Sequence, residues 1–279
     1  MRKTKKTKST KKLSTGKAVE TKKSSEVAAV TLSSLEALSG RGLQNVSTDT
    51  MATPRIKILM QLSPELEEIE GAKAGMIYNT VTQELFKSDE GIKIIPCYFQ
   101  LQYVEWTDRG QGSSAPINVY DASSDILMKT KRDEQNKDRL EGGNYIDTCH
   151  NHFVLVMEKS GVPSPAVITF KSTQLKHSKR WNTMMKRQFL KNANGTLFAA
   201  PSFAHVYKWS TMKESNDKGT WYGWNGPIKD AVITELDNSS EILQMAKDFE
   251  ESCRKGERNV SYEESETSNT NKLDENIPF

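Results

Sequence analysis

Cysteine is scarce in this sequence: the 279 residues include three, Cys97, Cys149 and Cys253. An odd number at wide spacing predicts reduced thiols in a cytosol-like compartment rather than a disulfide framework. Long apolar runs are also missing, since none approaches the roughly 18–20 residues that a membrane-spanning helix needs. The basic N-terminus, MRKTKKTKSTKK, has no apolar segment behind it, as a secretory signal would. We therefore expect a cytoplasmic protein without a membrane partner.

Motifs of the common enzyme classes are absent as well. The chain contains no GxxxxGK[ST] loop, no GxGxxG after a strand pattern, no GxSxG and no HExxH. The one metal-like cluster, CHNH at 149–152, lacks the second pair of ligands that a structural zinc site needs. Most carboxylates lie in runs such as ELEEIE and KDFEES, which are typical of solvated helix faces. The sequence therefore predicts no enzyme activity, no metal and no cofactor.

The charge is small in sum, +3, but unevenly distributed. Residues 1–25 carry ten Lys and Arg against one acid, and residues 257–279 carry six acids against two cations. A basic head and an acidic tail suggest a polyanion partner and a tail that competes for the same surface; two solubilising tails are the simpler alternative. The polar composition predicts a flexible arm over 1–50 and a disordered tail over 257–279, which flank a packed domain at 51–256.

Hydrophobic periodicity predicts a mainly β domain. Strand patterns occur in IKIIPCYFQLQYVEW, HFVLVMEK, AVITFK, FAHVYKWSTM and TWYGW, with a helical pattern before the last two. A closing helix is predicted in NSSEILQMAKDFEESCRKG, where Ile242, Ala246, Phe249 and Cys253 repeat at helical spacing. This order favours a β-barrel that resembles the OB fold, with inserted and C-terminal helices. The length beyond a minimal OB fold requires an insertion, expected around 121–150.

The longest strand pattern, IKIIPCYFQLQYVEW, has two different faces. Strict alternation places one set of side chains toward the core: Ile95, Cys97, Phe99, Leu101 and Tyr103. The opposite face mixes aromatic rings with amides: Tyr98, Gln100, Gln102 and Trp106. Among these, Trp106 and Tyr98 are the favoured candidates for stacking on a ligand.

A locally basic helix is predicted in STQLKHSKRWNTMMKRQF. From Lys171 to Arg187 there are six Lys and Arg residues and no acid, so phosphate contact is favoured over a merely solvated face. Ser172 or Thr173 is expected to cap the helix, and Phe189 to lie on its inner side.

Tryptophan accompanies basic residues throughout the domain, in QYVEWTDRG, KHSKRW, HVYKWS and KGTWYGW. Proteins that bind single strands without sequence preference need cations for phosphates and flat rings for bases. A core position is the alternative for each tryptophan. The candidate nucleic-acid contacts are Tyr98, Trp106, Arg109, Lys171, Lys176, Lys179, Arg180, Trp181, Lys186, Trp209, Trp221 and Trp224.

The last residues, LDENIPF, combine acids with apolar residues at a free terminus. They resemble the C-terminal tip of bacterial single-stranded DNA-binding proteins, with Asn276 in place of that family's last acid. The resemblance implies a docking peptide for replication, repair and recombination proteins such as a DNA polymerase, primase-helicase or recombinase. The implied docking residues are Asp274, Glu275, Ile277, Pro278 and Phe279.

The body is similar to the larger OB-fold single-stranded DNA-binding proteins of tailed bacteriophages, in segments such as PRIKILMQLSPEL and SNDKGTWYGW. This resemblance implies a protein that coats exposed strands during replication, recombination or repair in the host cytoplasm, with homo-oligomers possible. Two alternatives remain: a DNA-associated virion or scaffold protein, and a metal-dependent nuclease acting on single strands. RNA in place of DNA also stays open, because stacking does not distinguish the sugars.

Overall fold

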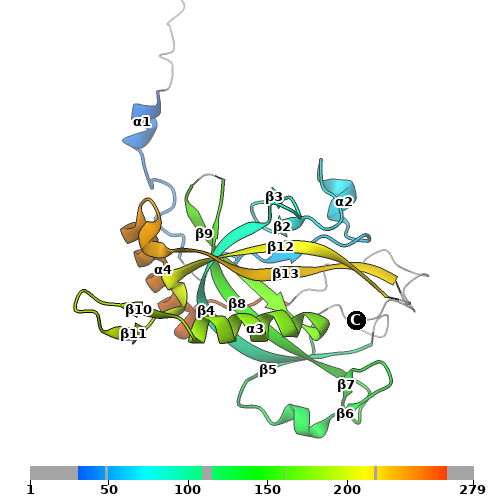
Figure 1. The fold of residues 1–279 in the computed structure, drawn as a ribbon. Helices are drawn as coiled ribbons and strands as arrows, with labels where there is room; N and C mark the ends of the chain where they lie inside the picture. Colours follow the sequence, from blue (N-terminus) through cyan, green and yellow to red (C-terminus); the bar gives the residue numbers. More distant parts are fainter. Residues whose placement is uncertain (1–30, 48–49, 109–114, 160, 217–218, 263–279) are drawn as a thin grey trace, which may run out of the picture. The chain divides into compact units, whose positions relative to one another are not determined.

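The computed structural model describes residues 31–47, 50–108, 115–159, 161–216 and 219–262 (Figure 1). The chain divides into two units, residues 1–46 and 47–279. In the described part of the first unit lies a short helix, α1 (Leu32–Glu36), capped by Thr31 and without a buried residue. This helix falls within the segment that the sequence predicts to be a flexible arm.

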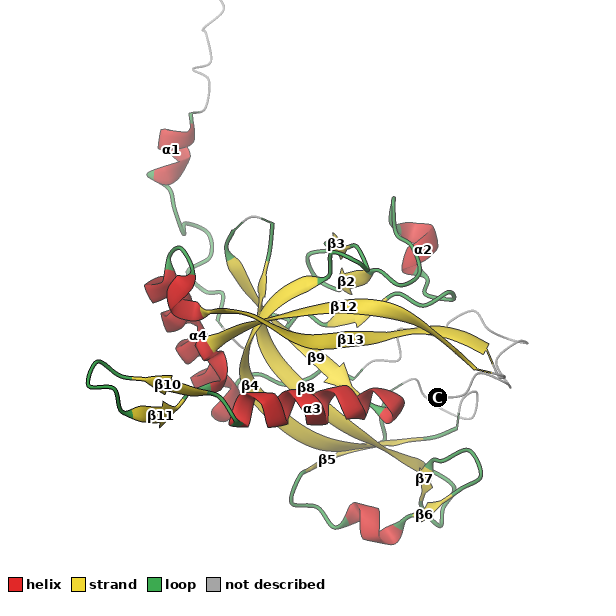
Figure 2. Ribbon diagram, viewed as in Figure 1, coloured by secondary structure: helices red, strands yellow, loops and turns green. Residues whose placement is uncertain are grey.

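The second unit is mainly β, as predicted (Figure 2). Its main sheet is antiparallel and curls into a half-barrel, with the path β13-β12-β4-β8-β7-β6; β5 pairs with β4, and β9 with β8 (Figure 1). The long central strands are β4 (Ile92–Trp106) and β8 (Tyr145–Met157). The others are β5 (Asn118–Asp121), β6 (Lys131–Arg132), β7 (Asp138–Arg139), β9 (Pro163–Phe170), β12 (His205–Asn216) and β13 (Gly219–Val232).

The predicted order of elements is confirmed. The hairpin β8–β9 leads through a 3-10 turn (Ser172–Gln174) into helix α3 (Leu175–Lys186), and the hairpin β12–β13 leads into α4 (Ser239–Arg254). Further 3-10 turns are Ile126–Lys129, Ser202–Ala204 and Ile233–Glu235. The predicted cap of α3 is wrong, because no side chain caps its N-terminus.

Each face of the sheet carries its own core, because neighbouring residues of a strand point to opposite faces. On one face, α4 buries Ile242, Ala246, Phe249 and Cys253, the four residues that its periodicity predicts, against β4, β8 and β9. On the other face, Trp181 of α3 is enclosed with apolar side chains of β4, β8, β9, β12 and β13.

Smaller elements complete the unit. A three-stranded sheet covers part of the α3 side: β1 (Ile56–Ile58), β2 (Ile77–Asn79) and β3 (Leu85–Phe86). The segment SPELEEIE contains a single helical turn, α2 (Glu65–Glu68), after Pro64. A separate hairpin between α3 and β12 pairs β10 (Phe189–Lys191) with β11 (Leu197–Ala199).

The structure corrects two local predictions in the domain. The insertion predicted around 121–150 overlaps the central strand β8, which begins at Tyr145. Phe189 does not lie on the inner side of a helix, because it begins β10 and is 58% exposed.

Order also extends past residue 256, where the predicted tail begins. The Tyr262 hydroxyl lies 2.7 Å from Asn151 Nδ2 and 2.8 Å from Gln102 Oε1, which ties the chain to the α4 side of the sheet.

A β-bulge changes the faces of β4. The register with β8 shifts between Pro96 and Tyr98, so the alternation that holds up to Cys97 is inverted beyond it. Tyr98 packs on the α4 side, with its ring centroid 6.1 Å from that of Phe153. Phe99, predicted to be core, is 37% exposed on the α3 side.

Candidate nucleic-acid interface

Helix α3 is joined to strand β8 by one serine and two histidines. His150 and His152 are two residues apart on β8 and therefore share a face. The hydroxyl of Ser178 lies 2.8 Å from His150 Nδ1 and 2.7 Å from His152 Nε2. The ring of Trp181 stacks on that of His152, with centroids 4.4 Å apart and planes at 21°. These contacts set where α3 crosses the sheet.

Both histidines are neutral at neutral pH. Burial lowers the pKa of His152 to about 3, and burial together with the charge of Lys179 lowers the pKa of His150. His152 Nδ1 is buried without a hydrogen-bond partner among the described residues. A proton on Nδ1 would leave a buried N–H unpaired, so we place it on Nε2, which donates to Ser178. The Ser178 hydroxyl then donates to His150 Nδ1.

Beyond α3, the same face of the sheet continues with aromatic side chains that the helix leaves partly uncovered. Directly paired residues of antiparallel strands share a face, and the register pairs Leu101 with His150 and Tyr103 with both Thr148 and Tyr120. Phe99 lies on this face too, with its ring centroid 5.2 Å from that of His150. We call this set the open face: Phe99, Leu101, Tyr103, Tyr120, Thr148 and His150.

Exposure on the open face falls mainly on its apolar side chains. Phe99 is 37% exposed, and Tyr103 and Tyr120 are half-buried, whereas His150 is 8% exposed. The ring of Tyr120 is held in place because its hydroxyl donates to Glu105 Oε2 at 2.6 Å. The open face therefore presents partly exposed rings on a rigid sheet.

Glu105 places a negative charge at the β5 end of the open face. Burial alone would raise the pKa of this carboxyl, but hydrogen bonds from Asn118, Tyr120 and Asn144 lower it. The carboxylate therefore stays ionised. An anionic ligand is repelled at this end and is favoured at the other end, beside α3.

The exposed side of α3 is basic. Lys176, Lys179, Arg180 and Lys186 are exposed, and no ion pair joins any of them to a carboxylate in the described parts of the chain. Lys171, just before the helix, lies 3.7 Å from Asp147. Residues 159–213 contain ten Lys and Arg and no acid. The five basic residues predicted between Lys171 and Lys186 are thus on the surface, and the charge of one of them, Lys179, acts on His150 of the open face.

A model of the Pam3 phage gp34-like protein family matches residues 21–259. The chain belongs to the Pam3 phage gp34-like family. The match includes every described element of the second unit and places the chain in a phage-related family. No curated protein and no solved structure matches the chain.

Most tryptophans of this family member are core residues, which corrects their proposed role as stacking platforms. Trp181 and Trp209 are fully buried, and Trp224 is 4% exposed, all in the core on the α3 side. Trp106 is 7% exposed and packs with Val104 and Cys149 on the opposite face of the sheet. No face of these rings is open to a base.

The remaining predicted contacts are dispersed. Trp221 is half-buried on β13, where its Nε1 donates to Glu214 at 3.1 Å. Tyr98 is half-buried on the α4 side, away from the open face. Arg109 and the five docking residues of the tip lie outside the described residues.

Phe99, Tyr103 and Tyr120 are the residues that the sequence reasoning missed. The sequence pattern predicts Phe99 and Tyr103 to be core residues only if the alternation continues through Pro96 without a break. Proline in the middle of a sheet is confined largely to edges and bulges. Pro96, inside the longest strand pattern, was therefore the available signal for an inverted face.

No metal centre stands out in the described parts of the chain. No group of three His, Cys, Asp or Glu side chains there is arranged to hold a metal ion. In the CHNH segment, Cys149 points to the face opposite His150 and His152. All three cysteines are free and buried. No helix among the described residues is both long and apolar enough to cross a membrane.

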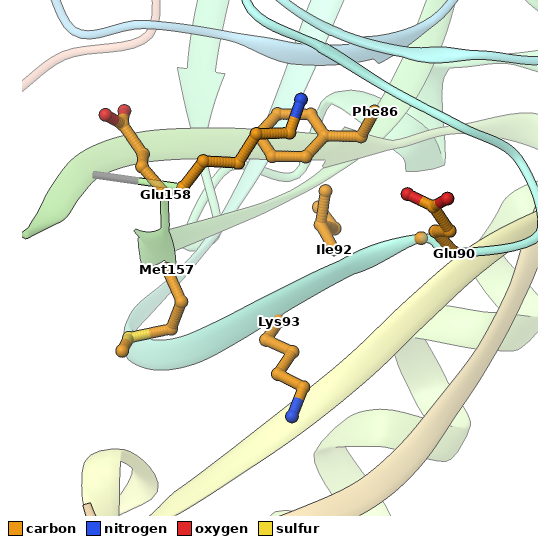
Figure 3. A pocket seen from close by; sticks show the side chains of 8 residues that line it. Phe86, Glu90, Ile92, Lys93, Met157 and Glu158 are labelled. Atoms are coloured by element: carbon orange, nitrogen blue, oxygen red, sulfur yellow. The ribbon is translucent and has the colours of Figure 1, made fainter. Parts of the chain in front are cut away.

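One small pocket lies between the start of β4 and the end of β8 (Figure 3). Phe86, Ile92 and Met157 supply its apolar lining, and Glu90 and Lys93 part of its polar rim. Its volume of about 220 Å³ is below the roughly 300–1,000 Å³ of typical small-molecule sites. We assign it no ligand.

Proposed function

We propose that this phage-family protein binds single-stranded DNA and coats exposed strands during replication, recombination or repair. The observation that carries the proposal is the position of the open face beside the basic side of α3. Bases would stack on Phe99, Tyr103 and Tyr120, and phosphates would lie along Lys176, Lys179 and Arg180. The charge of Glu105 at the far end orients the strand, because it keeps phosphates on the side of α3.

The proposal favours unpaired strands over a duplex. Base stacking on a side chain needs a base whose π-face is free, and in a duplex those faces are covered by neighbouring bases. A duplex could still contact the cations of α3 through its phosphates, but without the stacking contribution. The phage-related family and the resemblance of the C-terminal tip support DNA as the ligand.

The test is a titration of the full chain with oligo-dT and with duplex DNA of equal length at several salt concentrations. If the four exposed cations of α3 each neutralise one phosphate, log K for oligo-dT should fall with log[salt] at a slope of about −3. Affinity for oligo-dT should exceed that for the duplex at every salt concentration. Oligo-U in parallel distinguishes RNA from DNA.

Two results, one from this titration and one from a cleavage assay, would contradict the proposal. Equal affinity for single strand and duplex would indicate a DNA-associated structural role, such as that of a virion or scaffold protein. Cleavage of labelled single strands in the presence of magnesium or manganese would indicate a nuclease, whereas the proposed function includes no catalysis.

We also propose that the C-terminal tip recruits replication proteins. Phe279 would fill an apolar pocket of the partner, and Asp274, Glu275 and the terminal carboxylate would meet its basic rim. Phe279→Ala should abolish capture of phage or host replication proteins and leave oligo-dT affinity unchanged. Asn276→Ala, within the same segment but outside the matching set, is the control. If Phe279→Ala still captures these proteins, the tip does not have the proposed docking role.

A further inference from the structure

The hairpin β10–β11 stands apart from the main sheet. Its two strands pair only with each other, and it extends from the C-terminal end of α3 (Figure 1). The turn Asn192–Thr196 contains Gly195 at φ 78°, a left-handed conformation that glycine adopts without strain. Because the hairpin is not part of the main sheet, its side chains are not needed for the core of that sheet and can contact a ligand.

The hairpin exposes large apolar side chains. Phe189 is 58% exposed, Leu197 60% and Phe198 44%. The register pairs Lys191 with Leu197 and places Phe189 opposite Ala199, so Phe189, Lys191 and Leu197 share one face, which we call the arm face. Phe198 lies on the other side, paired with Leu190. Phe189 and Leu197 therefore expose apolar surface on the same face of the hairpin, and apolar patches of this kind, when contiguous and large, mark contact sites.

Charge indicates what the arm face contacts. Lys186, Arg187 and Lys191 are exposed at and beside the hairpin, and no ion pair joins them to a carboxylate among the described residues. The hairpin also lies within the stretch 159–213, which contains no acid. A ring flanked by unpaired cations fits a polyanion with flat apolar groups, which is the chemistry of a nucleic-acid strand.

We propose that the arm face is a second stacking site for the same single strand that the open face binds. This inference rests on the proposed function. Helix α3 links the two sites, because Ser178 contacts the sheet beside the open face and Lys186 precedes the hairpin. The 12 residues of α3 span about 18 Å. The cations of α3 would contact the phosphates of a strand that runs from the rings of the open face to Phe189. A base stacks on Phe189, and Lys191 pairs with its phosphate.

The test compares two lengths of oligo-dT with two matched variants of the full chain. An oligo-dT of about 5 nucleotides is near the lower limit of a single OB-type site, and one of about 16 is near the upper limit. Phe189→Ala should weaken binding of the long oligo about 5-fold, the loss of one modest stacking contact, and leave the short one unchanged. Phe198→Ala removes the same ring from the opposite side of the hairpin and should change neither by more than about 2-fold.

Each alternative outcome has its own signature. Wild-type affinity of Phe189→Ala for the long oligo, or equal losses in both variants, overturns the arm-face assignment while the proposed function stands. Failure of the unmodified chain to bind either oligo overturns the proposed function itself. If Phe189→Ala instead changes the sedimentation of the free protein, the hairpin contacts another protein copy and the inference is wrong. Lys191→Gln keeps the apolar surface of the hairpin and should weaken binding of the long oligo alone. This variant therefore separates loss of a ligand contact from misfolding of the hairpin.

Discussion

Alanine in place of both Phe99 and Tyr103 is expected to lower affinity for oligo-dT by about 30-fold or more. Loss of a stacked base costs roughly 1–3 kcal/mol, so two rings supply at least about 2 kcal/mol. Both rings come from β4, which is paired along its length with β8, so their spacing does not depend on a loop. Stability should change less than affinity, because Phe99 is 37% exposed and Tyr103 half-buried.

The matched control for this pair is Val119→Ala. Val119 on β5 is 43% exposed and pairs with Val104, so it points to the opposite face of the same sheet. Affinity should be unchanged in this variant. The measurement is fluorescence anisotropy of labelled oligo-dT, with circular dichroism to verify that each variant is folded. Unchanged binding by the double variant would remove the open face from the proposed function.

The sequence predicts the elements well where burial is periodic and local. The limits of β4 coincide with the strongest strand pattern, and the four residues predicted for the buried side of α4 are the four that it buries. The order of hairpins and helices was predictable for the same reason, because each of these elements is long and its apolar period is unambiguous. These features depend on neighbours in sequence.

The candidate site depends on residues that are neighbours in space, and the hydrophobic pattern of the sequence does not predict those contacts. Whether a tryptophan is core or platform is decided by what packs on it: Trp209 meets Trp181 and Trp224 from other elements, with ring centroids 5.1 and 5.9 Å away. Tyr120 reaches the open face only through the pairing of β5 with β4. The hairpin β10–β11, by contrast, carries a local signal that was missed, the Asn194-Gly195 turn between two short apolar runs.

Trp181→Ala is expected to lower the free energy of unfolding by about 3–5 kcal/mol, the range for removal of a large aromatic side chain from a packed core. The ring stacks on His152 and meets Tyr207 and Trp209 edge-on, with centroids 5.7 and 5.1 Å away. Its loss would leave a cavity between α3 and the sheet, bounded by rigid strands that relax little. Urea unfolding followed by circular dichroism measures the change.

The control is Trp221→Ala, because Trp221 is a half-buried residue of β13. Loss of its hydrogen bond to Glu214 should lower the free energy of unfolding by about 1 kcal/mol. Core and platform roles of Trp181 then predict opposite results. If Trp181 is a core residue, Trp181→Ala lowers the stability of the protein and affects oligo-dT binding only through the position of α3. Binding should then recover in Trp181→Phe, because phenylalanine refills most of the cavity. If Trp181 is a stacking platform, Trp181→Ala lowers the affinity for oligo-dT without lowering the stability of the protein. That second outcome would require α3 to move off the sheet when the ligand binds, and would overturn the assignment of Phe99 and Tyr103 as the stacking rings.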